Sequence, residues 1–205
     1  MKPVNLYRNI PVLVIALLLS GCGDSPELAP LPEDAVILAF GDSLTHGNGV
    51  DKNRSYPAAL ENLIGRKVVN AGVSGEISEQ GLKRLPGLLD QHRPDLLILC
   101  HGGNDILRKK DINEMADNVR AMIRHADERG IPVIMLGVPE PGLFLSSADI
   151  YNEIAEATGV IFIEDLIADI LGDKSLKSDT VHPNADGYRR MAEDIYAMLS
   201  DAGAV

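Results

Sequence analysis

The sequence predicts a single α/β domain, a three-layer α/β/α sandwich around a five-stranded parallel sheet. Two observations carry this prediction. Short, wholly apolar runs, typical of strands buried on both faces, alternate with longer segments in which apolar residues recur every three or four positions, as in helices that pack on one side. Strands that alternate with helices form a parallel sheet with right-handed crossovers, so helices are expected on both faces.

The strand and helix patterns follow one another in a regular order. The runs expected to form strands are 35–40, 67–70, 95–100, 131–137 and 160–163. The clearest helix is predicted over 111–129, where Asp111 and Glu114 fit a capping box. The last helix is predicted to begin at Asn184. No internal repeat and no second domain is evident from these patterns.

Composition excludes several classes of protein. Of the 205 residues 45% are hydrophobic, which is enough for a packed core and unlike a disordered tail or a collagen-like fibre. Lysine and arginine number 19 against 30 acidic residues, which gives a formal net charge of −11. A surface that acidic argues against binding to nucleic acid, which requires a basic surface.

The first residues are expected to be a secretory signal. Lys2 and Arg8 precede an apolar run over 10–19, which is shorter than the roughly 20 residues that cross a bilayer as a helix. The run ends in Leu-Ser-Gly-Cys at 19–22, which resembles the lipobox of bacterial lipoproteins. That resemblance implies cleavage before Cys22 and lipidation of the new N-terminus. The alternative is a plain secretory signal with a chance cysteine.

These features divide the chain into three parts: a lipoprotein signal peptide over 1–21, a lipidated anchor and linker over 22–33, and the folded domain over 34–205. By the usual lipoprotein sorting rule, Gly23 after the cysteine implies delivery to the outer membrane, on its periplasmic side. Membrane attachment through Cys22 is therefore expected.

Four polar clusters stand out against this framework. They are FGDSLT at 40–45, NAGVSGE at 70–76, GGND at 102–105 and DTVHP at 179–183. The first three follow predicted strands, and ligands bind at the carboxyl ends of strands in such sheets. Read singly, each has an ordinary structural explanation: a helix N-cap, two turns and a surface loop. The first three therefore lie at the carboxyl ends of strands, and the fourth adds an acid–histidine pair just before the last predicted helix.

In order and spacing the four clusters resemble the sequence blocks of the GDSL esterases, also called SGNH hydrolases. Within that family the chain looks most like the bacterial arylesterase, thioesterase and lysophospholipase group. The resemblance runs from about residue 35 to 199. It implies the flavodoxin-like SGNH hydrolase fold and hydrolysis of carboxylic esters or thioesters through an acyl-enzyme. It implies no cofactor, and no residues in the sequence have the spacing of metal ligands.

The resemblance assigns a role to each matching residue. Ser43 is implied as the nucleophile, His182 as its base and Asp179 as the acid that orients the histidine. The oxyanion hole is implied to consist of the Ser43 N–H, the Gly75 N–H and the side-chain amide of Asn104. A serine hydroxyl needs a base to become a nucleophile, and the carbonyl it attacks needs donors for the developing oxyanion.

Three further residues near these blocks have expected structural roles. Asp42 is expected to bond to loop backbone, and Asp105 is expected to support Asn104. His101, just before the third cluster, is expected to add a polar group near the mouth of the site.

The substrate is less well specified. Leu143, Phe144 and Leu145 follow the fourth strand, where they either contact an acyl chain or pack beneath a loop. Aryl esters, acyl thioesters or lysophospholipids are the expected substrates, and an O-acetylated envelope glycan is the alternative. Two further hypotheses are a non-enzymatic binding module and a flavodoxin-like or receiver domain. A monomer is expected.

Overall fold

A single parallel sheet forms the centre of the protein. The structure is a computed structural model that describes residues 27–140 and 146–205. Its strands are arranged in the order β2-β1-β3-β4-β5, and all neighbours are parallel. The strands are β1 (Val36–Gly41), β2 (Lys67–Gly72), β3 (Leu96–Cys100), β4 (Val133–Leu136) and β5 (Ile161–Ile163). The predicted α/β class with a five-stranded parallel sheet is confirmed.

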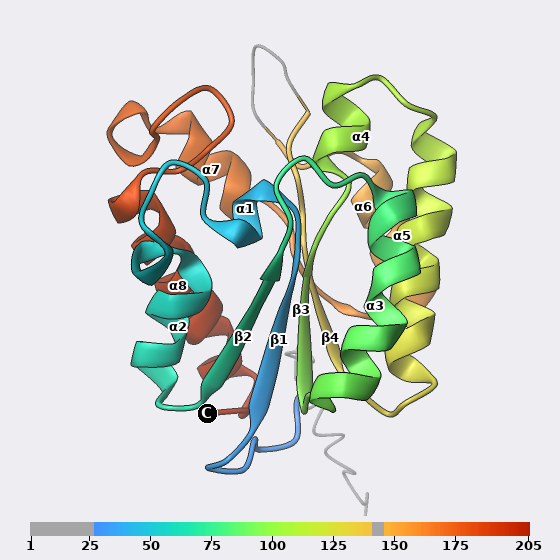
Figure 1. The fold of residues 1–205 in the computed structure, drawn as a ribbon, viewed down its shortest axis with the longest axis vertical. Helices are drawn as coiled ribbons and strands as arrows, with labels where there is room; N and C mark the ends of the chain where they lie inside the picture. Colours follow the sequence, from blue (N-terminus) through green and yellow to red (C-terminus); the bar gives the residue numbers. More distant parts are fainter. Residues whose placement is uncertain (1–26, 141–145) are drawn as a thin grey trace, which may run out of the picture.

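Helices cover both faces of the sheet. Figure 1 shows α2, α7 and α8 on one side and α3, α5 and α6 on the other. The helices of the described residues are α1 (Ser43–His46), α2 (Tyr56–Ile64), α3 (Ser78–His92), α4 (Gly103–Leu107), α5 (Ile112–Asp127), α6 (Ile150–Thr158), α7 (Leu166–Gly172) and α8 (Ala185–Asp201). Two 3₁₀ turns are η1 (Lys52–Arg54) and η2 (Lys174–Leu176). The core lies between these layers and the sheet.

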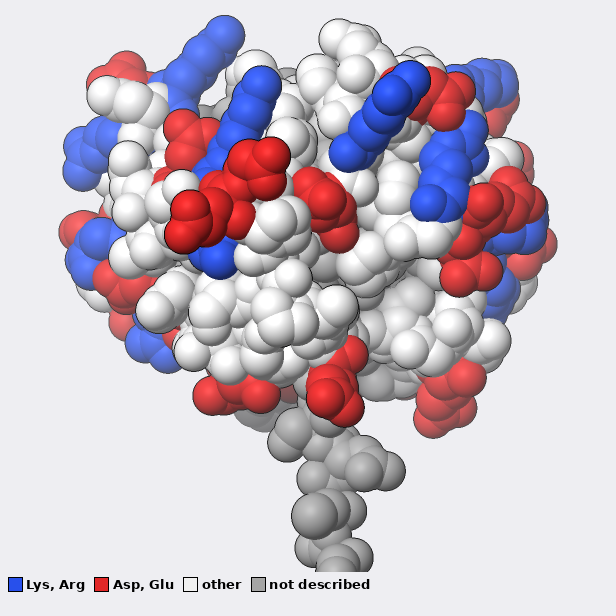
Figure 2. Space-filling view, turned by 90° about the horizontal axis from the view of Figure 1, so that it is seen from below, with Lys and Arg blue, Asp and Glu red and all other residues white. Residues whose placement is uncertain are grey.

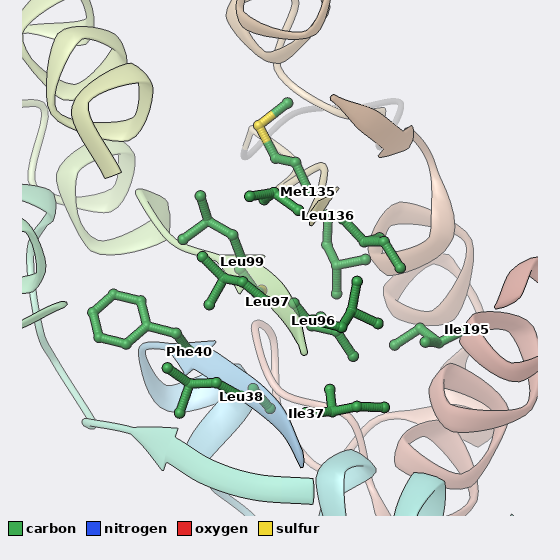
Figure 3. Packing of buried hydrophobic residues seen from close by; sticks show 14 of the residues in the cluster. Ile37, Leu38, Phe40, Leu96, Leu97, Leu99, Met135, Leu136 and Ile195 are labelled. Carbon is green, nitrogen blue, oxygen red and sulfur yellow. The ribbon is translucent and has the colours of Figure 1, made fainter. Parts of the chain in front are cut away.

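Alternating side chains of the central strands fill both halves of the core. Phe40 of β1 and Leu99 of β3 are register partners and lie on the face covered by α3 and α5. On the other face, Ile37 and Leu96 point toward Ile195 of α8 (Figure 3). All five side chains are fully buried. Burial on both faces explains why these strands appear in the sequence as continuous apolar runs rather than as alternating patterns.

The first two strands extend further than predicted, into glycines. β1 and β2 were expected to end at residues 40 and 70, but Gly41 and Gly72 are paired in the sheet. A Cβ atom on Gly41 would overlap the carbonyl oxygen of Cys100, and one on Gly72 would overlap the backbone of His46. Close backbone approach therefore requires glycine at both positions, although glycine in a sequence usually indicates the end of a strand.

The helix boundaries follow their caps. Asp111 lies just before α5 and accepts hydrogen bonds from the N–H groups of Asn113 and Glu114. Asn184 caps α8 in the same way. The last helix was predicted to begin at Asn184, and its first helical residue is Ala185. β4 is shorter than the predicted run because Pro132 has no N–H to donate to a neighbouring strand.

The two ends of the sheet have different surroundings. The strands point toward α1 and α4 at their carboxyl edge, and the C-terminus lies at the opposite edge (Figure 1). The described chain also begins there, since the Leu28 N–H donates to the Ala202 carbonyl and the Leu31 N–H to that of Ala204. Within residues 27–140 and 146–205, no helix has the length and apolar character needed to cross a bilayer.

We expect Gly41→Ala to lower the free energy of unfolding by about 1–3 kcal/mol, because the added methyl group forces β1 away from the Cys100 carbonyl. Gly87→Ala is the matched control: Gly87 is exposed within α3, with open space around its Cα. That substitution should stabilise the protein by about 0.5–1 kcal/mol. Urea unfolding measures both, and equal stability of the two variants would contradict the close approach at Gly41.

Candidate active site

The four clusters meet at the carboxyl edge of the sheet. Ser43 is the first residue of α1, directly after β1, and Asn104 lies in α4, directly after β3. Gly75 is in the loop after β2, and His182 precedes α8. Because parallel strands end at the same edge, residues far apart in the sequence become neighbours there.

Ser43, His182 and Asp179 form a hydrogen-bonded chain. The Nε2 atom of His182 lies 2.9 Å from Ser43 Oγ, and its Nδ1 atom lies 2.8 Å from Asp179 Oδ2. Burial alone would raise the pKa of Asp179, but hydrogen bonds from the Val181 N–H and the His182 imidazole outweigh it and hold the pKa below its ordinary value. The carboxylate is thus ionised beside the ring, which favours the tautomer with its proton on Nδ1 and leaves Nε2 free to accept a proton from the serine.

A buried carboxylate connects the serine to the amide expected in the oxyanion hole. Asp42 accepts a hydrogen bond from the Leu44 N–H at 3.1 Å, which caps α1, and another from Asn104 Nδ2 at 3.1 Å. Burial raises the pKa of Asp42, although the hydrogen bonds from the Leu44 N–H and the Asn104 amide act in the opposite direction. Asp42 therefore bonds to loop backbone, as expected, and also holds Asn104.

The loop after β2 lies against Asn104. The Asn104 amide also donates to the carbonyl oxygen of Glu76 at 3.1 Å, so the amide is held from two sides. Gly75 has a φ of +78°, which only glycine adopts readily, and its carbonyl accepts a hydrogen bond from Arg108 Nη2 at 2.8 Å. Gly75 is thus linked to Asn104 through its chain neighbour Glu76.

Asp105 has a different partner from the one expected. Its two carboxylate oxygens accept hydrogen bonds from the N–H and the hydroxyl of Ser78, both at 2.8 Å. It therefore fixes the start of α3 against α4, and Asp42 is the carboxylate that holds Asn104. Consecutive helical side chains point in different directions, so Asp105 is poorly placed to bond to its neighbour.

His101 was expected near the mouth of the site, but it lies in the interior. Its exposed fraction is 1%, and its Nε2 atom faces Glu76 at 3.2 Å. The physical reason is the alternation of β3, since residue 101 points to the same face as Leu97 and Leu99. That face is covered by α3.

A cleft of about 760 Å³ opens beside the triad. Ser43, Asn104 and His182 line it, together with charged groups at Glu140, Asp169 and Lys177. Its apolar lining comes from Leu44, Leu107, Val138, Ala168, Leu171 and Val181. The expected substrate contacts Leu143, Phe144 and Leu145 lie outside the described residues, and so does Cys22.

Two contributors to this region were missed in the sequence. Arg108 belongs to a run of basic residues that is typical of a solvated surface, yet its guanidinium bonds to the loop that holds Gly75. Glu76 lies within the second cluster but had no assigned role, and its carboxylate is paired with Arg84 of α3. Neither contact has a local sequence signal, because each joins separate elements.

Within the part of the chain that the structure describes, no group of three or more His, Cys, Asp or Glu side chains is arranged to hold a metal ion. The donors around Ser43 are instead imidazole, amide and backbone groups. This set suits nucleophilic chemistry with proton transfer between side chains.

Comparison with known proteins identifies the family. Residues 39–190 match the model of the GDSL-like Lipase/Acylhydrolase family. The chain belongs to this family. A 28% identity over 195 residues relates it to Esterase TesA of Pseudomonas aeruginosa, covering 90% of this chain and 97% of that protein. An arylesterase of Vibrio mimicus is 33% identical over 171 residues, covering 77% of this chain and 84% of that protein.

The same family appears among solved structures. A crystal structure of TesA has a TM-score of 0.75 and 27% identity, and the match covers 82% of this chain and 99% of that one. Family membership, together with relatives named as esterases, confirms the sequence-based prediction of an ester-bond hydrolase.

Proposed function

We propose that this protein is a serine esterase in which Ser43 forms the acyl-enzyme, His182 is the general base and Asp179 orients the histidine. The observation that carries the proposal is the hydrogen-bonded chain from Ser43 Oγ through both nitrogens of His182 to Asp179, at 2.9 and 2.8 Å. These hydrogen-bonded side chains lie beside a cleft with room for a small acyl group.

The reaction proceeds in two halves. His182 Nε2 takes the proton of Ser43 as the oxygen attacks the ester carbonyl. The oxyanion that forms is bound by the Ser43 and Gly75 N–H groups and by the Asn104 amide, which exchanges one of its two hydrogen bonds, to Asp42 or to the Glu76 carbonyl, for the oxyanion. The imidazolium then gives its proton to the departing alcohol or thiol. In the second half, His182 activates a water molecule, which releases the acid and frees Ser43.

The cleft supports acyl or aryl esters and thioesters as the substrate class. Apolar side chains such as Leu107 and Leu171 line it near Ser43, and Leu107 is half-exposed. The names of the relatives, an esterase and an arylesterase, agree with such substrates. An O-acetylated glycan is the alternative and would use the polar groups of the same cleft, Glu140 and Asp169.

Replacing Ser43 by alanine should lower kcat for p-nitrophenyl butyrate by at least about 10⁴-fold, because the variant lacks the hydroxyl that lies within hydrogen-bond distance of His182 Nε2. The variant should also lose labelling by a fluorophosphonate probe while its melting temperature stays close to that of the wild type. A Ser43→Ala variant that keeps most of its activity would remove Ser43 as the nucleophile.

The same assay distinguishes the substrate classes. p-Nitrophenyl acetate through palmitate, an acyl-CoA, a lysophospholipid and an acetylated xylan are compared by kcat/KM, with Ser43→Ala as the blank. We expect the aryl and acyl substrates to be preferred. Preference for the xylan would instead support the glycan alternative.

Activity should fall on acidification. We expect kcat/KM to decrease as the pH is lowered from about 8 to 5, because a protonated His182 cannot accept the Ser43 proton. Asp179, whose pKa lies below its ordinary value, stays ionised over this range. A flat profile, with circular dichroism reporting folded protein throughout, would count against a histidine base.

We extend the proposal to the place of action: the bacterial cell envelope, with Cys22 lipidated and the domain held on the periplasmic side of the outer membrane. Near the start of the described chain, Leu28 pairs with Ala202 at the edge of the sheet opposite the cleft. Figure 2 views the molecule from below, and on that face Lys and Arg are interspersed with Asp and Glu. A mixed surface attracts anionic lipid weakly, so attachment by acyl chains suits it better.

Cys22→Ser should move the protein from the membrane fraction to the soluble fraction of cells that produce the full chain. The wild type should incorporate labelled palmitate, and the variant should not. Ester hydrolysis per folded molecule should be equal in both, since Ser43, His182 and Asp179 are unchanged. A variant that still sediments with membranes would contradict lipid anchoring.

A further inference from the structure

His101 is a buried imidazole that the proposed reaction does not use, and both of its ring nitrogens are bonded. Nε2 lies 3.2 Å from the Oε2 atom of Glu76, and Nδ1 lies 3.0 Å from the backbone nitrogen of Gly102. The Gly102 N–H can only donate, so Nδ1 is the acceptor and the ring proton is on Nε2. A neutral imidazole with one donor and one acceptor satisfies both partners.

Each partner belongs to a different half of the expected oxyanion hole. Glu76 directly follows Gly75, and its carbonyl oxygen accepts a hydrogen bond from the Asn104 amide. Gly102 precedes α4 as its N-cap, two residues before Asn104. The ring of His101 therefore bridges the loop after β2 and the start of α4.

The Glu76 end of this bridge is fixed to the rest of the fold. Arg84 of α3 donates to both oxygens of the Glu76 carboxylate, at 2.9 and 2.6 Å, and to the carbonyl of Ala71 in β2 at 3.0 Å. Burial would raise the pKa of Glu76, but the bonds from His101 and Arg84 and the charge of Arg84 hold it below its ordinary value. The acceptor for His101 is therefore an ionised carboxylate.

Packing holds the imidazole in this position. A Cβ atom on Gly81 of α3 would overlap the Nε2 atom, so the helix leaves space for the ring only because residue 81 is glycine. The Phe40 ring stacks on the imidazole with centroids 5.7 Å apart. The Tyr151 hydroxyl donates to the backbone carbonyl of His101 at 2.7 Å, which fixes the end of β3.

We infer that His101 is a positioning residue that sets the distance between the two halves of the oxyanion hole, Gly75 on one side and Asn104 on the other. The inference rests on the proposed function, since an oxyanion hole has meaning only for ester hydrolysis at Ser43. His101 acts through Glu76 and through the Gly102 N–H and does not touch the substrate.

The test uses three substitutions that remove the ring bonds selectively. His101→Leu removes both bonds, His101→Gln can keep the donor to Glu76, and His101→Asn can keep the acceptor for Gly102. We expect His101→Leu to lower kcat by about tenfold to hundredfold, the effect of a misplaced reacting group, with KM within about threefold of the wild type. The Gln and Asn variants should each recover part of the loss.

A second measurement separates positioning from stability. A trifluoromethyl ketone inhibitor forms a hemiketal with the catalytic serine and places its oxyanion in the hole. Its inhibition constant should rise in His101→Leu by about the same factor as kcat falls, because both report transition-state stabilisation. Ile154→Val is the matched control: it removes one buried methylene group from α6, changes no hydrogen bond of the His101 ring, and should lower the melting temperature with kcat unchanged.

The possible outcomes are distinct. If His101→Leu loses stability but keeps kcat and the inhibition constant, His101 is only structural and the inference is wrong. If the His101 variants do not fold, Glu76→Gln provides the test. Its single amide oxygen cannot accept all three hydrogen bonds that the Glu76 carboxylate accepts from His101 and Arg84. It should lower kcat by about tenfold, and an unchanged kcat overturns the inference. A wild type that neither hydrolyses esters nor labels at Ser43 would instead overturn the proposed function itself.

Discussion

The hydrogen bond between Ser43 and His182 depends on the packing of the whole domain. It joins a residue after the first strand to a residue before the last helix, so it forms only when α8 is packed on the sheet. Tyr188 of α8 strengthens this connection, because its hydroxyl donates to the Asn48 carbonyl in the loop after α1. Asn184 fixes the other side: it caps α8 and its amide donates to the Ser175 carbonyl.

The remaining polar groups of the site serve to hold a few donors in place. A carboxylate as buried as Asp42 is costly unless it is hydrogen-bonded, and its two partners are the cap of α1 and the Asn104 amide. Glu76, whose carbonyl accepts a hydrogen bond from the same amide, has its carboxylate paired with the partly buried Arg84. Electrostatic stabilisation of an oxyanion is strongest when the fold already positions its donors, and these contacts position the Asn104 side chain.

The sequence was sufficient for the fold class and for the residues that meet at the sheet edge. Both are encoded locally: the strands as apolar runs, and Ser43 and His182 as members of short clusters after strands or before a helix. Contacts between elements were not encoded in this way. Asp105 bonds to Ser78, and Arg108 to Gly75, across gaps of 27 and 33 residues that no periodicity reveals.

His101 combines a feature that is encoded locally with a contact between elements. Its position directly after a buried strand was visible, but its direction depends on whether the alternation of β3 continues for one more residue. Because it does, the ring faces α3, where Gly81 leaves room for it. Glycine is unfavourable inside a helix. Here it is required, because a side chain from another element occupies the space that a Cβ atom would need.

The most direct test of the account is the rate at which an alkyl fluorophosphonate reacts with Ser43 in the wild type and in His182→Ala, with peptide mass spectrometry locating the adduct. We expect one phosphonylated peptide, containing Ser43, and a rate constant at least about a hundredfold lower without the imidazole. An adduct at another residue, or equal rate constants in the two proteins, would contradict the claim that His182 activates Ser43.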